Sequence, residues 1–144
     1  MSAKVFLDTN VFVYEIDSKA AKVKRQIAHE LILDALKERR SVVSYQVIQE
    51  FLNVVTGKFS SLISASDAQQ YVNAVFEPLT VVQSSIELFG EALGIHTRYQ
   101  LSWYDSLIVA AASEANCTVL YSEDLQHGAK INGVRIENPF RAGR

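Results

Sequence analysis

Strand-like and helix-like segments alternate along this sequence, and the alternation predicts an α/β fold: a three-layer α/β/α sandwich with a mostly parallel central sheet. Short apolar runs such as Lys4 to Leu7 have the length and composition of buried strands. Longer segments between such runs carry apolar residues at helical spacing, for example Ile27, Leu31 and Ile32. The 144 residues are 49% hydrophobic, which is enough for one core, so we expect a single domain over residues 1–144.

The expected elements follow from these patterns and from the capping residues between them. The strands are Lys4–Leu7, Ser41–Ser44, Leu79–Val82, Thr118–Tyr121 and Val134–Ile136. The helices are Val11–Ile16 opened by Thr9-Asn10, about Ser18–Arg40, Tyr45–Val55, a helix capped by Ser66 that runs to Glu77, about Ser85–Tyr99 with a possible weak point at Gly94, and Trp103–Ala115 after a Ser102 cap. A polar loop, Ser122–Gly128, follows the fourth strand.

Composition excludes several classes of protein. The net charge of −2 is not that of a protein that binds nucleic acid by bulk charge, so any such contact needs a local basic patch. No apolar run approaches the ~20 residues of a membrane helix, and the N-terminus lacks the pattern of a signal peptide. Cys117 is the single cysteine, which excludes an internal disulfide. We therefore expect a cytoplasmic protein.

Four carboxylates occupy positions where a parallel sheet gathers ligands. Asp8 directly follows the first strand, and Asp124 lies just past the fourth. Glu50 lies in the second turn of the helix after the second strand, and Asp105 lies in the first turn of its helix. Ligands of open parallel sheets bind beyond the carboxyl ends of the strands. We expect the four acids to converge at that end of the sheet.

Each acid also has an ordinary interpretation, as a helix cap, a loop residue or an exposed charge. Together, however, carboxylates at one strand end repel each other, and either protonation or a cation must relieve this repulsion. Oxygen ligands favour Mg²⁺ or Mn²⁺ over zinc. The three histidines, His29, His96 and His127, do not form a zinc-binding pattern and are interpreted as structural or surface residues.

A magnesium site built only from acids indicates phosphate chemistry, because the metal activates water and stabilises the attacking and leaving oxygens. The sequence has no Walker loop, no GxSxG and no GxGxxG, so it gives no support to an NTPase, a serine hydrolase or a Rossmann oxidoreductase.

Four motifs resemble those of the PIN-domain nucleases, in the order and at about the spacing of that family. They are Phe6 to Asn10 (FLDTN), Ser44 to Phe51 (SYQVIQEF), Trp103 to Ala111 (WYDSLIVAA) and Ser122 to Asp124 (SED). The C-terminal segment that follows is similar to that of compact bacterial PIN proteins, many of them VapC-like toxins. The resemblance implies a Mg²⁺-dependent endoribonuclease, commonly a homodimer, that a small antitoxin protein holds inactive.

Carried over by position, Asp8, Glu50 and Asp105 match the three core acids of the family. Asp124 matches the more variable fourth, although Glu123 beside it keeps that assignment open. Thr9 and Asn10 match polar residues that support the first acid, and Ser122 replaces a more frequent threonine.

The resulting hypothesis is hydrolysis of RNA. Asp8 and Asp105 would hold the catalytic metal directly, and Glu50 and Asp124 would bind it through water or hold a second ion. The basic stretch Lys22, Lys24 and Arg25 would attract the RNA strand, and Trp103 or Tyr104 would stack a base unless buried in the core or in a dimer interface.

Two alternatives remain open. One is a PIN fold that binds RNA or a protein without cutting. The other is a phosphohydrolase of the haloacid-dehalogenase type, although that chemistry uses a second carboxylate two residues after the first, where this chain has Asn10.

Overall fold

A computed structural model describes residues 3–57 and 61–141, and the rest of the predicted 1–144 domain lies outside the described residues. Its centre is a six-stranded sheet of order β3-β2-β1-β4-β6-β5. All neighbouring strands are parallel except β5 and β6, which pair antiparallel. The predicted α/β class with a mostly parallel sheet is confirmed.

The strands agree closely with the expected ones. They are β1 (Lys4–Leu7), β2 (Ser41–Ser44), β3 (Thr80–Val82), β4 (Cys117–Tyr121), β5 (Lys130–Ile131) and β6 (Val134–Glu137). Apolar side chains of β1, β2 and β4 are buried because helices cover these central strands.

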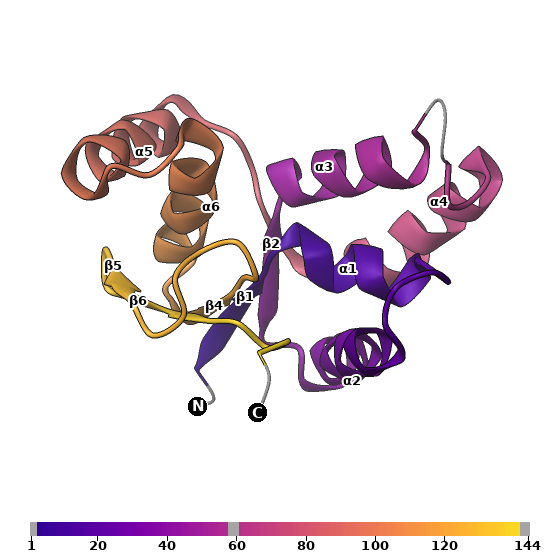
Figure 1. The fold of residues 1–144 in the computed structure, drawn as a ribbon. Helices are drawn as coiled ribbons and strands as arrows, with labels where there is room; N and C mark the ends of the chain where they lie inside the picture. The colour runs from indigo at the N-terminus through magenta and orange to yellow at the C-terminus, as the bar shows by residue number, and fades with distance from the viewer. Residues whose placement is uncertain (1–2, 58–60, 142–144) are drawn as a thin grey trace.

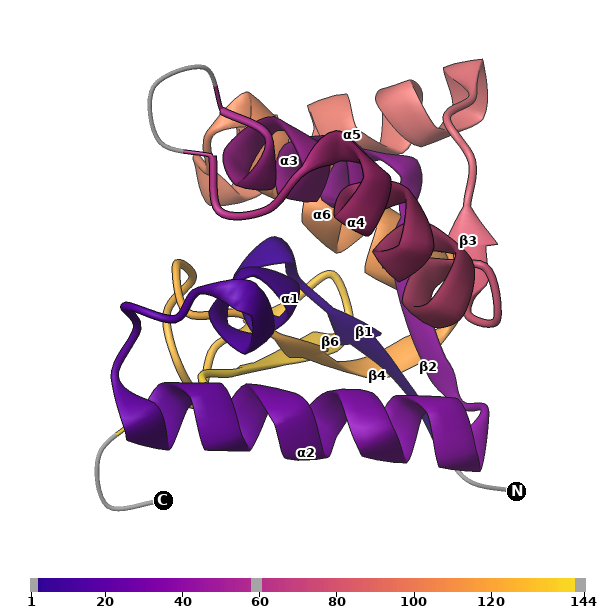
Figure 2. The same cartoon turned by 90° about the vertical axis from the view of Figure 1, so that its right-hand side faces the viewer.

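Helices cover both faces of the sheet, as Figure 2 shows with α2 below it and α3 to α6 above it. They are α1 (Thr9–Ile16), α2 (Lys22–Glu38), α3 (Tyr45–Val55), α4 (Ala65–Tyr71), the π-helical segment η1 (Val72–Phe76), α5 (Ile86–Tyr99) and α6 (Trp103–Glu114). Helix α6 packs on the sheet and α5 packs on α6, while α1 contacts both α2 and α3 (Figure 1).

Three expected details were wrong. Helix α2 begins at Lys22 and not near Ser18, and the side chain that caps α4 is Ser64, whose Oγ accepts from the Asp67 amide at 3.0 Å. Helix α5 runs unbroken through Gly94. Strand β5 was not expected, although an Asn-Gly turn, a strong hairpin signal, joins it to β6.

The interior fixes which side of α3 is available for chemistry. Val47, Phe51 and Val55 are fully buried at helical spacing, and the Phe51 ring packs edge-on to Phe76 with centroids 5.2 Å apart. The neighbouring stripe, which contains Glu50, is therefore only half-buried. Among the described residues, no helix is long and apolar enough to span a membrane.

The register of the central strands aligns their carboxyl ends. Leu7 of β1 pairs with Tyr121 of β4, and Tyr121 pairs with Glu137 of β6. The amide of Asp8 donates to the Tyr121 carbonyl at 3.1 Å, so the first residues beyond β1 and β4 lie side by side.

Candidate active site

Asp8 is held by two donors at the end of β1. Its Oδ1 accepts from the Thr9 amide at 2.7 Å, which caps α1, and its Oδ2 accepts from the Ser122 hydroxyl at 2.9 Å. Burial raises the pKa of the Asp8 carboxyl from 3.8 to about 6 against the effect of these hydrogen bonds, and the nearby charges of Glu50 and Asp124 raise it further. Burial and the neighbouring negative charges therefore both disfavour the ionised form of Asp8.

Glu50 is fixed from two elements. Its Oε2 accepts from the Thr9 hydroxyl at 3.0 Å, and its Oε1 accepts from Gln46 Nε2 at 2.6 Å. Thr9 thus supports two acids at once, Asp8 through its amide and Glu50 through its hydroxyl. These contacts join the starts of α1 and α3 beside the end of β1.

The other two acids belong to α6 and to the loop after β4. Asp105 lies in the first turn of α6, where its amide donates to the Ser102 hydroxyl at 3.1 Å, the expected cap. Asp124 is exposed, and its amide donates to Ser122 Oγ at 3.3 Å. The pKa of Asp124 is raised by partial burial and then by the charges of Asp105, Glu123 and Glu50.

The charges of Glu50 and Asp124 therefore act on Asp8, and the charges of Asp105 and Glu50 act on Asp124. In the described part of the chain none of the four forms an ion pair with a Lys, Arg or His. Within those same residues, no group of three His, Cys, Asp or Glu side chains is arranged to hold a metal ion. The donor atoms that the four acids offer are all carboxylate oxygens, the type of ligand that Mg²⁺ and Mn²⁺ prefer.

Glu123 differs from its neighbour Asp124. Its carboxylate accepts from Lys24 Nζ at 2.6 Å, from the Tyr14 hydroxyl, and from Asn10 Nδ2 at 3.4 Å. Burial opposes ionisation, but the hydrogen bonds from Lys24 and Tyr14 and the Lys24 charge lower the pKa of Glu123. Asn10 thus supports Glu123, whereas the resemblance placed it beside the first acid. Among the described residues, the Asp124 carboxylate has no such partners.

The Lys24–Glu123 contact separates Lys24 from the other two residues of the predicted basic stretch, Lys22 and Arg25. Lys24 is engaged with Glu123, and its ammonium lies 4.9 Å from the centre of the Tyr14 ring. Lys22 and Arg25 are exposed. The Lys24 contact was not foreseen, because it joins residues 99 positions apart in the sequence.

The remaining predicted side chains lie around the site or on the surface. Tyr104 is 66% exposed, while Trp103 is half-buried and packs near Phe89. All three histidines are exposed and make local contacts: His29 with Glu15, His96 with the Leu101 carbonyl, and His127 with the Asn138 amide.

The sequence model of the PIN domain family matches residues 5–130 of this chain. The chain is a member of the PIN domain family. This assignment agrees with the resemblance seen in the four motifs, and it leaves the haloacid-dehalogenase interpretation without support.

Solved PIN-fold structures share the architecture at low sequence identity. VapC20 of Mycobacterium tuberculosis, a toxin that cleaves the sarcin-ricin loop, superposes with a TM-score of 0.65 at 17% identity over 84% of this chain and 90% of that chain. DNA-bound VapBC of Salmonella typhimurium gives 0.67 at 19% identity over 94% and 98%, and FitAcB of Neisseria gonorrhoeae gives 0.67 at 13% over 94% and 98%. No curated protein matches the sequence.

Proposed function

We propose that this PIN domain is a metal-dependent endoribonuclease that hydrolyses RNA phosphodiester bonds with Mg²⁺ or Mn²⁺. The electrostatics of Asp8, Glu50, Asp105 and Asp124 support the proposal most: charges within this set raise the pKa of Asp8 and of Asp124, and no member has a basic partner among the described residues, in a family of nucleases. A fold without catalytic function gains nothing from this repulsion.

Under this proposal the acids bind the metal, and the polar residues that contact them keep them oriented. Asp8 and Asp105 would hold the metal directly, and Glu50 and Asp124 would bind it through water or hold a second ion. When bound, the metal supplies an activated water and stabilises the charge of the scissile phosphate. Thr9 and Ser122 keep the carboxylates of Asp8 and Glu50 oriented.

RNA would approach across the exposed cations Lys22 and Arg25. Their positive charge reduces the repulsion between the RNA phosphates and the four acids, which together form the acidic site. The charge of Lys24 is already paired with Glu123, so Lys24 would contribute less to the attraction of RNA. Charge at Lys22 and Arg25 should therefore affect affinity for RNA more than charge at Lys24.

The test is cleavage of single-stranded RNA by the purified protein. We expect cleavage with Mg²⁺ or Mn²⁺, none in EDTA, and a loss of rate in Asp8→Asn that exceeds the ~10–100-fold typical of outer-shell changes. Asparagine keeps the oxygen that caps α1, so the variant should fold. Asp34→Asn, a change of the same kind at an exposed position on α2, is the matched control and should keep full activity. Full activity of wild-type protein in EDTA would overturn the proposal.

We also propose that the nuclease acts as the toxin of a toxin–antitoxin pair and forms a homodimer. Support comes from the fold shared with VapC20, VapBC and FitAcB, and from the exposed apolar residues Ile86 (79%) and Leu93 (54%) on α5. Expression in a bacterial host should arrest growth, and co-expression of a small protein encoded by a short reading frame just upstream should restore it. A sedimentation mass of one chain would contradict the dimer.

The alternative of a binding module makes the opposite prediction at the same site. A PIN fold that holds RNA without cutting it would bind RNA equally well with Asp8 or Asn at position 8. Calorimetric titration with Mn²⁺ that shows no heat in the wild-type protein would favour this alternative.

A further inference from the structure

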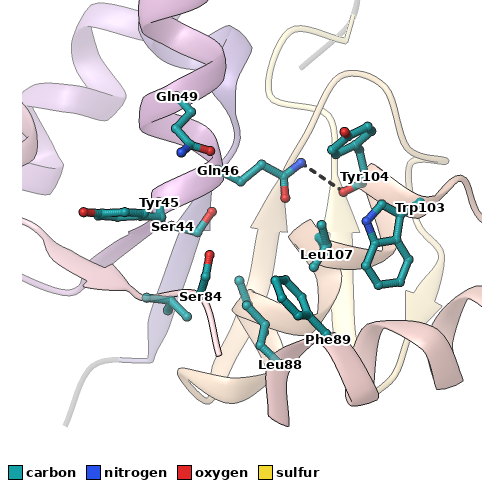
Figure 3. A pocket seen from close by; sticks show the side chains of 12 residues that line it. Ser44, Tyr45, Gln46, Gln49, Ser84, Leu88, Phe89, Trp103, Tyr104 and Leu107 are labelled. Atoms are coloured by element: carbon teal, nitrogen blue, oxygen red, sulfur yellow. Dashed lines mark hydrogen bonds between the residues drawn. The ribbon is translucent and has the colours of Figure 1, made fainter. Parts of the chain in front are cut away.

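A pocket of about 250 Å³ opens beside the acidic site, between α3, α5 and α6 (Figure 3). Leu88, Phe89 and Leu107 form an apolar wall, and the Trp103 ring lies 6.3 Å from that of Phe89. Ser44 and the side chain of Gln46 form a polar rim. The volume is below the roughly 300–1,000 Å³ of sites for drug-sized ligands, so the pocket suits one small planar group.

Gln46 connects this pocket to the acids. Its Nε2 donates to Glu50 Oε1 at 2.6 Å and to the Tyr104 carbonyl at 3.1 Å, one residue before Asp105. Because both partners only accept, the amide nitrogen must point at them. The Gln46 oxygen is then directed toward the pocket, as Figure 3 shows, where it can only accept a hydrogen bond.

We propose that this pocket binds one base of the RNA substrate next to the scissile phosphate, and that Gln46 Oε1 accepts a hydrogen bond from an N–H group of that base. The inference rests on the proposed nuclease function and adds a determinant of sequence specificity to it. Gln46 lines the pocket and donates to Glu50, so only this side chain separates a group in the pocket from Glu50. A base of the RNA strand bound at the four acids is therefore the ligand that we expect there. Apolar walls with one directed acceptor match the flat faces and polar edge of a base.

A specificity role requires that Gln46 distinguish between bases, beyond its contact with Glu50. Loss of the Glu50 contact slows cleavage of every sequence to the same extent. Loss of the base contact removes a preference for one base. A single neutral hydrogen bond corresponds to a preference of roughly three- to tenfold. The ratio between sequences, and not the rate itself, is therefore the decisive measurement.

The experiment measures binding and cleavage separately. Fluorescence anisotropy gives the affinity of the Asp8→Asn protein for single-stranded RNA hexamers that differ in the base at one position. We expect a roughly three- to tenfold preference for one base. Adding Gln46→Met should abolish it, and adding Gln69→Met should not. Gln69 makes a similar i to i+4 contact, to Asn73 at 3.1 Å on α4 and η1, and does not line the pocket.

An analogue of the preferred base in which C–H replaces the N–H donor localises the contact. It should weaken binding to Asp8→Asn and leave binding to the Gln46→Met double variant unchanged. A preference that survives Gln46→Met, or the absence of any preference, overturns the inference. So does a Gln46→Met effect on dimer dissociation alone, which would mean that a protein occupies the pocket.

Cleavage distinguishes this failure from failure of the proposed function. If wild-type protein cuts no RNA, the nuclease proposal fails while the binding preference still decides the role of the pocket. If wild-type protein cuts RNA and Gln46→Met slows all sequences equally, Gln46 only positions Glu50.

Discussion

Glu123 and Asp124 are adjacent in the chain, yet their surroundings have opposite electrostatic character. Glu123 accepts from Lys24, Tyr14 and Asn10, and its pKa is lowered. Asp124 lies toward Asp105 and Glu50, and its pKa is raised. We call the first group, Asn10, Tyr14, Lys24 and Glu123, the anchor, and the four acids the acidic site.

The difference shows how one loop can serve two purposes. The anchor satisfies its carboxylate within the protein and so fixes the loop after β4 against α1 and α2. The acidic site leaves its carboxylates in mutual repulsion, which a bound cation relieves. Stability of the metal-free protein therefore depends on the anchor, and metal binding depends on the acidic site.

The largest expected effect is the pH dependence at Asp8 without metal. The folded protein holds this proton up to about pH 6, whereas the unfolded chain releases it near 3.8. The stabilisation is complete below the lower value and is lost as pH rises through the higher one, about 3 kcal/mol in all. Urea denaturation in EDTA between pH 3 and 7.5 should show wild type losing nearly this amount relative to Asp8→Asn. Parallel pH profiles of the two proteins would contradict the raised pKa.

Metal binding should give the next largest effect. At pH 7.5, Mn²⁺ at a hundred times its dissociation constant should raise the free energy of unfolding by about 2.7 kcal/mol. Asp105→Asn should remove most of this gain, because the Asp105 side chain belongs to the acidic site and makes no hydrogen bond among the described residues. Asp67→Asn, an exposed acid on α4, should keep it. Equal gains in all three proteins would place the metal elsewhere.

Neutralising each of the two neighbouring acids in turn tests the comparison most directly. Glu123→Gln leaves Lys24 without its charged partner and should destabilise the metal-free protein by up to about 1 kcal/mol. Asp124→Asn should leave the metal-free protein unchanged or slightly more stable, and should weaken Mn²⁺ binding. Thermal unfolding and calorimetric titration of both variants give the two readouts. If Glu123→Gln is the variant that weakens metal binding, the fourth acid is Glu123.

The smallest effect concerns the phenol of the anchor. Tyr14→Phe removes the hydrogen bond to Glu123 and a longer one that the hydroxyl accepts from Lys24 at 3.3 Å. Lys24 still partners the carboxylate directly, so we expect a loss of about 0.5 kcal/mol. Tyr45→Phe, an exposed tyrosine on α3, should change nothing. A loss of several kcal/mol in Tyr14→Phe would mean that the anchor supports more of the fold than its contacts indicate.

Local signals in the sequence were sufficient for most of the fold. Strand β1 and helix α3 have the expected bounds because apolar spacing and capping residues are short-range properties. Asp8 and Asp124 follow neighbouring parallel strands, whose ends are aligned, and the charge of Asp124 acts on Asp8.

The missed features depend on choices that pattern alone does not settle. Ser64 and Ser66 are both competent caps, and only Ser64 has its hydroxyl placed to accept from the Asp67 amide. The β5–β6 hairpin has a signal that could have been used, Asn132 and Gly133, both with positive φ. The Gln46 contact to the Tyr104 carbonyl joins residues 58 positions apart and follows only from packing of α3 beside α6.

The position of β1 between β2 and β4 also determines when the acidic site can form during synthesis. Strand β2 is made soon after β1, but β4 begins only at Cys117. A ribosome that has made about one hundred residues has released Asp8 and Glu50 without Asp105 or Asp124. Under the proposed function, an unfinished chain therefore lacks two of the four acids that would bind the metal.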